Sequence, residues 1–246
     1  MPIPSPEFFE SAAAHCSWPS AERLRYYSTQ LFRDVDLAGK RFLDVGGGSG
    51  IFTLYAAAAG ARIAICIDSE SDGSTSSGGD GFGKVTAQFG LSNATRRSDP
   101  FQGYDPIEAP FDIILLHNSI NHLDEEACMR LREGGVYRER YRAIAARLAA
   151  LASPNCQLIL SDCGRRNFFH DAFGKRSPLT PTIEWHKHHE PEIWIELLTT
   201  EGFRHPKVRW TTPSRLGRFG SPLSARAIQY FLFSHFSLRM VRAPRA

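Results

Sequence analysis

A glycine-rich turn joins a short apolar segment to an alanine-rich one in the first quarter of the chain. The run Arg41–Val45 reads RFLDV, which is typical of a buried strand. The five residues GGGSG follow at once at 46–50. Residues 51–59, IFTLYAAAA, are typical of a helix, and the next apolar run, 62–67, ends at Asp68. Strand, glycine turn, helix and strand in this order predict a βαβ unit.

The same alternation continues along the chain. Further strands are predicted at 95–97, 111–116, 157–161, 207–211 and 234–241, and helices at 20–32, 138–151 and 191–200. The last two strands are expected at sheet edges, with a loop over 212–233 between them. Strands that alternate with helices are typical of a mostly parallel sheet covered on both faces. We therefore expect a single α/β fold, Rossmann-like and doubly wound, with a seven-stranded, mostly parallel sheet and helices on both faces.

Composition excludes several other classes of protein. With 42% hydrophobic and 22% charged residues among 246, the chain can bury a sizeable core and is not disordered. No apolar run reaches the ~18 residues that a membrane span needs. The first ten residues contain no Lys or Arg, so no secretory signal is expected and the predicted location is cytoplasmic. None of the five cysteines forms a Cys-x-x-Cys pair, so reduced, structural thiols are expected.

The glycine spacing distinguishes between nucleotide-binding folds. Gly46, Gly48 and Gly50 give G-x-G-x-G, whereas the dinucleotide fingerprint also requires glycine at position 51, which is Ile51. A nicotinamide cofactor is therefore disfavoured. The phosphate-binding pattern G-x-x-x-x-G-K-[ST] is absent from the sequence as well. Asp68, at the end of the second strand, is placed to accept hydrogen bonds from both hydroxyls of a ribose.

The sequence resembles the class I S-adenosylmethionine-dependent methyltransferases over roughly residues 20–211. Their first motif, an acid, any residue and G-x-G-x-G, is matched by DVGGGSG at 44–50. Supporting matches are Asp68, Asp99, Phe111-Asp112 and the turn Glu201-Gly202-Phe203. The resemblance implies S-adenosylmethionine as cofactor. It implies that the cofactor-binding residues are Asp44, Gly46, Gly48, Gly50, Asp68, Ser69, Asp99, Pro100 and His117.

The sequence departs from the family in two places. A Ser/Gly-rich segment follows Asp68, which leaves the roles of Ser69, Glu70 and Asp72 open. After the fourth strand, residues 117–123 read HNSINHL in place of the D/N-P-P-Y/F box of enzymes that methylate amino groups of nucleic acids. Base methylation by that route is therefore disfavoured.

Methyl transfer to oxygen or nitrogen requires a positioned acceptor and benefits from a general base, for which histidine is suited. We predict His117, Asn118, His122 and His186 as catalytic residues. A purely structural role for His122, as a helix cap or packed under a loop, stays open. The segment 186–189 has three readings: a lid, a source of the base, or a metal site. No metal is predicted, because neither histidine group has a recognised ligand spacing.

The chain is divided into an N-terminal helical segment, 1–40, expected to cover the cofactor site, and a methyltransferase domain, 41–246, with a lid near 165–192. Residues 203–246 carry nine Lys or Arg and no Asp or Glu, although the net charge of the chain is only +3. The expected partner is a small or medium-sized molecule, and this basic segment is compatible with an anionic one.

Two other functions stay open at this point. One is binding or modification of RNA through the basic C-terminal segment, although a nucleic-acid partner is disfavoured. The other is a protein that binds S-adenosylmethionine without catalysis. The sequence does not identify the methyl acceptor, the acceptor atom or the oligomeric state.

Overall fold

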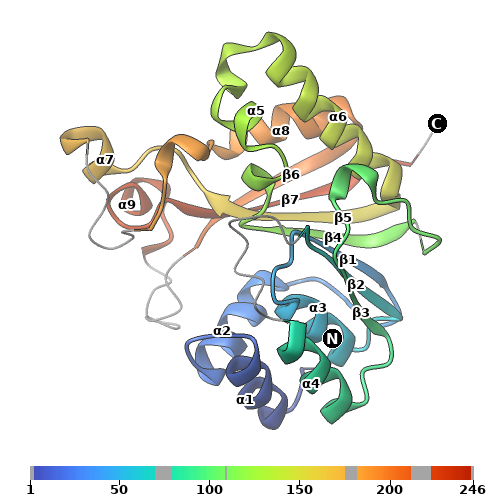
Figure 1. Ribbon diagram of the computed structural model, residues 1–246. Helices are drawn as coiled ribbons and strands as arrows, with labels where there is room; N and C mark the ends of the chain where they lie inside the picture. Colours follow the sequence, from blue (N-terminus) through green and yellow to red (C-terminus); the bar gives the residue numbers. More distant parts are fainter. Residues whose placement is uncertain (1–2, 70–78, 109, 175–181, 212–222, 245–246) are drawn as a thin grey trace.

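The computed structural model describes residues 3–69, 79–108, 110–174, 182–211 and 223–244, and contains a seven-stranded sheet with helices on both faces (Figure 1). The strand order is β3-β2-β1-β4-β5-β7-β6. The strands are β1 (Arg41–Val45), β2 (Ile63–Ile67), β3 (Ala94–Arg97), β4 (Phe111–His117), β5 (Ala152–Cys163), β6 (Phe203–Trp210) and β7 (His235–Arg242). Strands β1 to β5 pair in parallel, and β7 runs antiparallel to β5 and β6. The predicted fold is confirmed.

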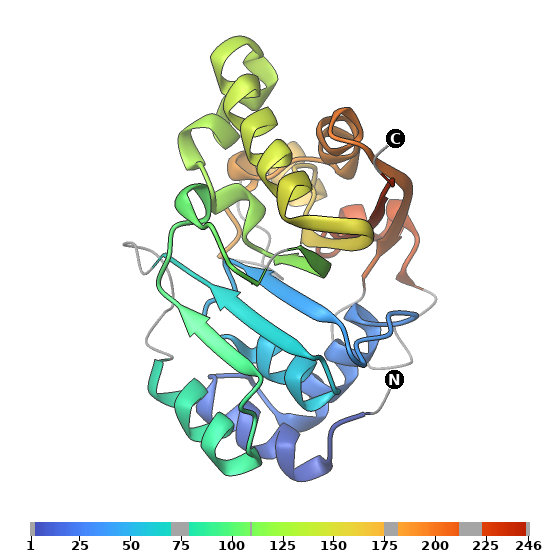
Figure 2. The same cartoon turned by 90° about the vertical axis from the view of Figure 1, so that its right-hand side faces the viewer.

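Two layers of helices cover the sheet (Figure 2). One layer consists of α1 (Pro6–His15), α2 (Ala21–Leu31), α3 (Ile51–Ala58) and α4 (Gly79–Phe89). The other consists of α5 (Glu125–Met129), α6 (Gly135–Leu151) and α8 (Pro191–Thr200). Two short helices, α7 (Phe168–Phe173) and α9 (Arg226–Phe231), contact each other at one end of the molecule. The 3-10 turns are η1 (Phe101–Gly103), η2 (Ile120–His122), η3 (Leu131–Glu133) and η4 (Trp185–Lys187).

The continuous apolar strands reflect burial on both faces of the sheet. In β1, Phe42 lies in the core beneath α1–α4, whereas Leu43 and Val45 belong to the core beneath α5, α6 and α8. A strand between two helical layers needs apolar side chains at successive positions, which explains why the run RFLDV does not alternate. Helix α2 begins as predicted, since the hydroxyl of Ser20 accepts a hydrogen bond from Arg23 N at 3.2 Å.

The C-terminal part differs from the prediction in three respects. Strand β5 starts at Ala152 and continues through Pro154, because its first residue pairs with Phe111 of β4 across an irregularity in register. Strand β7 lies between β5 and β6, so the prediction of an edge strand at 234–241 was wrong. Helix α9 occupies part of the expected loop, of which 212–222 lie outside the described residues. Strand pairing over long sequence distances determines these features.

The N-terminal helices pack on the first βαβ unit. Helix α1 contacts α2 and α4, and the aromatic rings of Phe32 and Tyr55 stack with centroids 5.1 Å apart, which joins the end of α2 to α3. That this segment covers the cofactor site stays a prediction. Among the helices of the described part of the chain, none is long and apolar enough to cross a membrane.

Candidate functional site

The glycine turn lies at the carboxyl end of β1 and leads directly into α3. Gly46, Gly48 and Gly50 have φ angles of +67°, +56° and +73°. Residues other than glycine rarely adopt this left-handed backbone conformation. The turn is closed by a hydrogen bond from Gly50 N to the carbonyl oxygen of Gly47 at 2.9 Å. The glycines are therefore required by the backbone path itself.

The space around the turn differs between Gly48 and the other two glycines. A Cβ atom on Gly46 would lie 2.5 Å from Ser119 Cβ, and one on Gly50 would lie 2.6 Å from Cδ2 of Phe82. By contrast, a Cβ on Gly48 would have no described heavy atom within 4 Å. Gly48 thus presents its backbone to open space, where a ligand can approach closely.

Asp68 links the turn to the end of β2. Its Oδ2 accepts a hydrogen bond from Gly48 N at 2.7 Å, and its side chain is buried. Gly46 N donates to the carbonyl oxygen of Ile67 at 2.7 Å, which holds the two strand ends together. On the other side, Arg96 Nε donates to the carbonyl oxygen of Gly48 at 2.9 Å. The backbone of Gly48 is therefore held from both sides, by the side chain of Arg96 in β3 and by that of Asp68 after β2.

Asp44 lies inside the protein beneath the turn. Its Oδ2 accepts a hydrogen bond from the Thr53 hydroxyl at 3.1 Å, whereas the buried Oδ1 has no partner in the described structure. Burial, with a smaller contribution from the charge of Asp68, raises the pKa of Asp44 to about 7. A donor group placed at Oδ1 would compensate this carboxylate.

The remaining predicted cofactor residues follow the ends of neighbouring strands. Ser69 is exposed and comes directly after Asp68. Asp99 is half-buried and Pro100 exposed, and both follow β3, which is paired with β2. His117 is the last residue of β4. The structure thus brings the predicted positions to one edge of the sheet. Their contacts with a cofactor stay a prediction, and Glu70 and Asp72 lie outside the described residues.

His117 connects β4 to the N-terminal helices. Its Nε2 is 2.7 Å from the hydroxyl oxygen of Tyr27 in α2, and its ring lies 4.7 Å from that of Phe52 in α3, between centroids. Burial is the main cause that lowers the pKa of His117 to about 3, and it raises the pKa of Tyr27 to about 12. Both groups are therefore neutral near pH 7, so His117 there is a neutral hydrogen-bonding group.

A second group of polar residues lies at the carboxyl ends of β4 and β5 and at the start of β7. The Oδ1 of Asn118, whose φ is +51°, lies 3.1 Å from Nε2 of His235 at the start of β7. Asp162 is fully buried and its Oδ1 lies 3.0 Å from Nδ1 of His188, whose side chain is 13% exposed. Burial is the main cause that lowers the pKa of His235 to about 4; the charge of Asp162 opposes this shift, and His188 adds to it. We call Asn118, Asp162, His188 and His235 the β4–β5 cluster.

The other predicted catalytic residues lie outside this cluster. His122 is exposed, and its Nδ1 is 2.6 Å from Oε1 of Glu125. His186 is also exposed, and its backbone oxygen accepts a hydrogen bond from Arg165 at 3.2 Å. Asn121, the residue before His122 in the 3-10 turn after β4, is buried, and its Nδ2 lies 3.4 Å from Nε2 of His122. In the described ranges, no three His, Cys, Asp or Glu side chains are grouped so as to hold a metal ion.

Comparison with known proteins supports the fold. No protein-family model matches the chain, and no curated protein matches it. Among solved structures, a putative S-adenosylmethionine-dependent methyltransferase from Listeria monocytogenes has a TM-score of 0.59 and 13% identity, over 90% of this chain and 99% of that one. The magnesium protoporphyrin IX methyltransferase ChlM of Synechocystis, solved with bound S-adenosylmethionine, has a TM-score of 0.53 and 17% identity, over 89% and 78%.

A third similar structure is longer than this chain. The pyocyanin biosynthetic protein PhzM has a TM-score of 0.54 and 19% identity over 88% of this chain, which spans only 54% of PhzM. At these identities the comparisons establish the fold of the class I methyltransferases, as the DVGGGSG motif predicted.

The sequence did not single out Tyr27 or His235. Tyr27 lies 90 positions from its partner His117, and His235 lies 117 positions from Asn118. The only signal was the position of His117 and Asn118 at the end of a strand. Asp162 lies near the end of β5, and His188 belongs to the segment 186–189, for which a source of the base was one of the three readings.

Proposed function

We propose that the protein is an S-adenosylmethionine-dependent methyltransferase that methylates an oxygen or nitrogen atom of a small or medium-sized molecule. One observation carries the proposal: the backbone of Gly48 faces open space beside the carboxylate of Asp68. In doubly wound folds, ligands bind at this edge of the sheet, and an acid at the end of the second strand binds the ribose hydroxyls. The fold similarity to methyltransferases supports the same reading.

The residues at this edge fit the proposed cofactor. Asp68 is placed for the ribose, and Gly48 leaves room for a flat or extended ligand. The unpartnered Oδ1 of Asp44 suits a donor such as an ammonium group, bound directly or through water. Asp99 follows the neighbouring strand and is proposed to face the adenine, as the resemblance implies. When bound, S-adenosylmethionine supplies a methyl group on a positively charged sulfur.

Two histidine–carboxylate pairs are candidates for the general base. The pair His122–Glu125 is open to solvent, with side chains 54% and 45% exposed, whereas in His188–Asp162 these values are 13% and 0%. A shielded pair holds its imidazole in one orientation and is less screened by water. We therefore favour His188 over His186 and His122. With Nδ1 donating to Asp162, its Nε2 is left to take the proton of the acceptor.

The cofactor is tested by calorimetry with S-adenosylmethionine and with its demethylated product. Asp68→Ala should weaken both at least about tenfold, because it removes a charge-assisted hydrogen bond. Glu139→Ala, which removes an exposed carboxylate from α6, is the matched control and should leave affinity unchanged. Absence of binding of either compound to the wild-type protein would refute the proposal.

The reaction is tested by incubating the protein with methyl-labelled cofactor and a low-molecular-weight cell extract. Label should appear in small molecules, and the acceptor identified in this way allows rate measurements. His188→Gln should then lower kcat by about 10²-fold or more, with cofactor affinity retained, while His122→Gln changes it less. The reverse order would assign the base to His122. Binding without transfer to any extract component would favour the non-catalytic alternative.

A further inference from the structure

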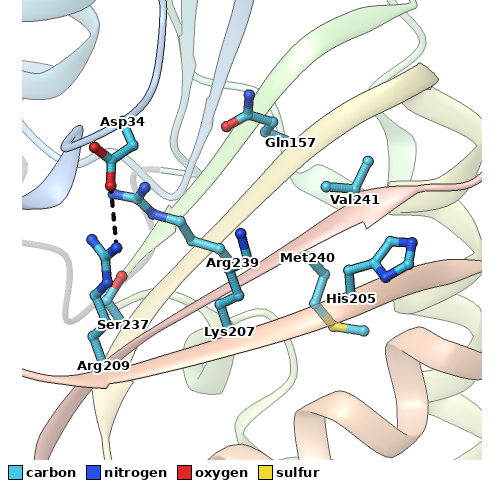
Figure 3. A pocket seen from close by; sticks show the side chains of 9 residues that line it. All are labelled: Asp34, Gln157, His205, Lys207, Arg209, Ser237, Arg239, Met240 and Val241. Atoms are coloured by element: carbon cyan, nitrogen blue, oxygen red, sulfur yellow. Dashed lines mark hydrogen bonds and ion pairs between the residues drawn. The ribbon is translucent and has the colours of Figure 1, made fainter.

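The face of the sheet next to α2 carries a pocket of about 440 Å³ over β5, β7 and β6 (Figure 3). Four residues that are paired across β4, β5, β7 and β6, in this order, show where the pocket begins. Leu115 and Ile159 lie in the core beneath α1–α4, whereas the next two residues in the row, Arg239 and Lys207, line the pocket. Paired residues point to the same face, so an apolar core gives way here to a charged surface.

The pocket is strongly cationic. Its polar lining consists of Asp34, Gln157, Lys207, Arg209, Ser237 and Arg239, to which His205 adds an imidazole. Asp34 is the single acid of the lining, and its Oδ2 lies 3.1 Å from a terminal nitrogen of Arg209. Lys207 has no carboxylate within ion-pair distance in the described structure. Three permanent cations and one acid leave an excess of about two positive charges, attractive to an anion.

The lining is held in place by contacts outside the pocket. The guanidinium of Arg239 donates to the backbone oxygens of Leu31, at 2.8 Å, and of Arg33, at the end of α2. Burial, followed by repulsion from Arg209 and Arg33, lowers the pKa of Arg239. In Figure 3 the side chains of Lys207, Arg209 and Arg239 extend from the strands toward the same space as Asp34. The cations are therefore gathered around one space despite their mutual repulsion.

We propose that this pocket binds the phosphate group of a small molecule. A phosphate monoester carries a charge of about −1.5 to −2 near neutral pH, which matches the excess in the lining. The planar guanidinium of Arg209 suits two phosphate oxygens, and Lys207 adds a mobile point charge. Asp34 already shows how an anion is bound by Arg209, and the incoming phosphate would take its place or lie beside it.

The site is distinct from the cofactor edge. Its lining on β7 runs from Ser237 to Val241, toward Gln157 near the start of β5, whereas the proposed cofactor residues lie at the opposite ends of β1–β4. A concave pocket of this volume falls in the range of about 300–1,000 Å³ that is typical of small-molecule sites. The inference does not depend on methyl transfer.

The test is titration with inorganic phosphate and with glycerol 3-phosphate at constant, low ionic strength, followed by calorimetry and ³¹P NMR. The wild-type protein should bind one equivalent saturably. Lys207→Gln and Arg209→Gln should each weaken binding about tenfold, because each removes a charged partner. Asp34→Asn should strengthen binding several-fold, because the competing carboxylate is lost. Tighter binding of the ester than of inorganic phosphate would show that the pocket also contacts the organic part of the ligand. Equal binding would show that it recognises the phosphate group alone.

Lys84→Gln is the matched control, since Lys84 is an exposed lysine on α4. It should bind phosphate as the wild type does. The proposal is overturned if the wild type shows no saturable binding, or if Lys84→Gln and Lys207→Gln lose the same affinity. Cofactor affinity measured on the same samples separates the two proposals: the pocket variants should leave it unchanged, and Asp68→Ala should leave phosphate binding unchanged.

Discussion

The two halves of the sheet are built differently. In the β3-β2-β1-β4 half, short parallel strands of four to seven residues lie between two helical layers, and the neighbours of Gly46 and Gly50 in the turn leave no room for a Cβ atom. In the β5-β7-β6 half, longer strands of eight to twelve residues pair partly antiparallel and carry polar side chains on one face. The first half is buried on both faces, whereas the second half is buried on one face and carries the polar pocket on the other.

This difference predicts how each half responds to substitution. A close-packed turn tolerates neither added volume nor an uncompensated charge, whereas polar contacts near the surface are partly replaced by water. Substitutions in the first half should therefore cost more stability than comparable ones in the second. The three predictions below test this, each with a control from the chain itself.

The largest effect is expected at Asp44. Its pKa is raised from 3.8 to about 7, chiefly by burial, so the native state binds its proton more tightly than the unfolded state. The contribution of this proton to the free energy of unfolding is fully present below pH 4 and is lost as the pH rises through 7. Its full size is about 4 kcal/mol. Asp44→Asn stays neutral and lacks this loss. Urea unfolding of the ligand-free protein at pH 5 and pH 8.5 measures the difference.

The comparison between variants removes the contribution of other carboxylates. Asp36→Asn, at an exposed position, should keep the pH dependence of the wild type. Parallel pH profiles for the wild type and Asp44→Asn would mean that Asp44 ionises normally in the folded protein. The idea of an uncompensated charge beneath the turn would then be wrong.

The next effect is expected at Gly50. Alanine there would require a left-handed residue at φ +73° and place Cβ 2.6 Å from Phe82, so we expect a loss of about 3 kcal/mol. Gly174, in the other half of the chain, has nearly the same backbone, with φ +62° and ψ +17° against ψ +18° at Gly50, but a Cβ there meets no atom of the described residues within 4 Å. Gly174→Ala should cost only about 1 kcal/mol. Equal losses in urea unfolding would show that backbone conformation alone, and not packing, requires glycine in the turn.

The first half could be predicted from the sequence because its features are local. The strand, the glycine turn, the helix and Asp68 all lie within 41–68, and the turn chemistry depends on spacings of two residues. The resemblance to methyltransferases rests on the same segment. Spacing along the chain does not reveal, however, that Gly47 must be glycine because Asp44 and Cys66 would lie within 2.7 Å of its Cβ.

The second half could be predicted only in part. Strands β6 and β7 were expected, but their order depends on pairing with β5, which no local pattern encodes. The β4–β5 cluster joins residues at the end of β4, at the end of β5 and at the start of β7 with one from the segment before α8, and His188 and Asp162 are 26 positions apart. The basic composition of 203–246 was recognised, whereas its concentration on one face follows from the register of β6 and β7.

The smallest effect is expected where the halves meet, at Tyr27. Tyr27→Phe removes the hydroxyl that lies 2.7 Å from Nε2 of His117 and 3.4 Å from Oγ of Ser161, and the loss of these neutral hydrogen bonds should cost about 1 kcal/mol. Since burial lowers the pKa of His117 to about 3, the imidazole stays neutral and this loss should be the same at pH 5 and pH 8. Tyr230→Phe, which removes a hydroxyl 3.0 Å from an oxygen of Asp171 at the surface, is the control and should cost less. If the stability lost in Tyr27→Phe changes with pH around 6.5, His117 titrates normally. The contact between α2 and β4 would then be accessible to water, like the polar contacts of the second half.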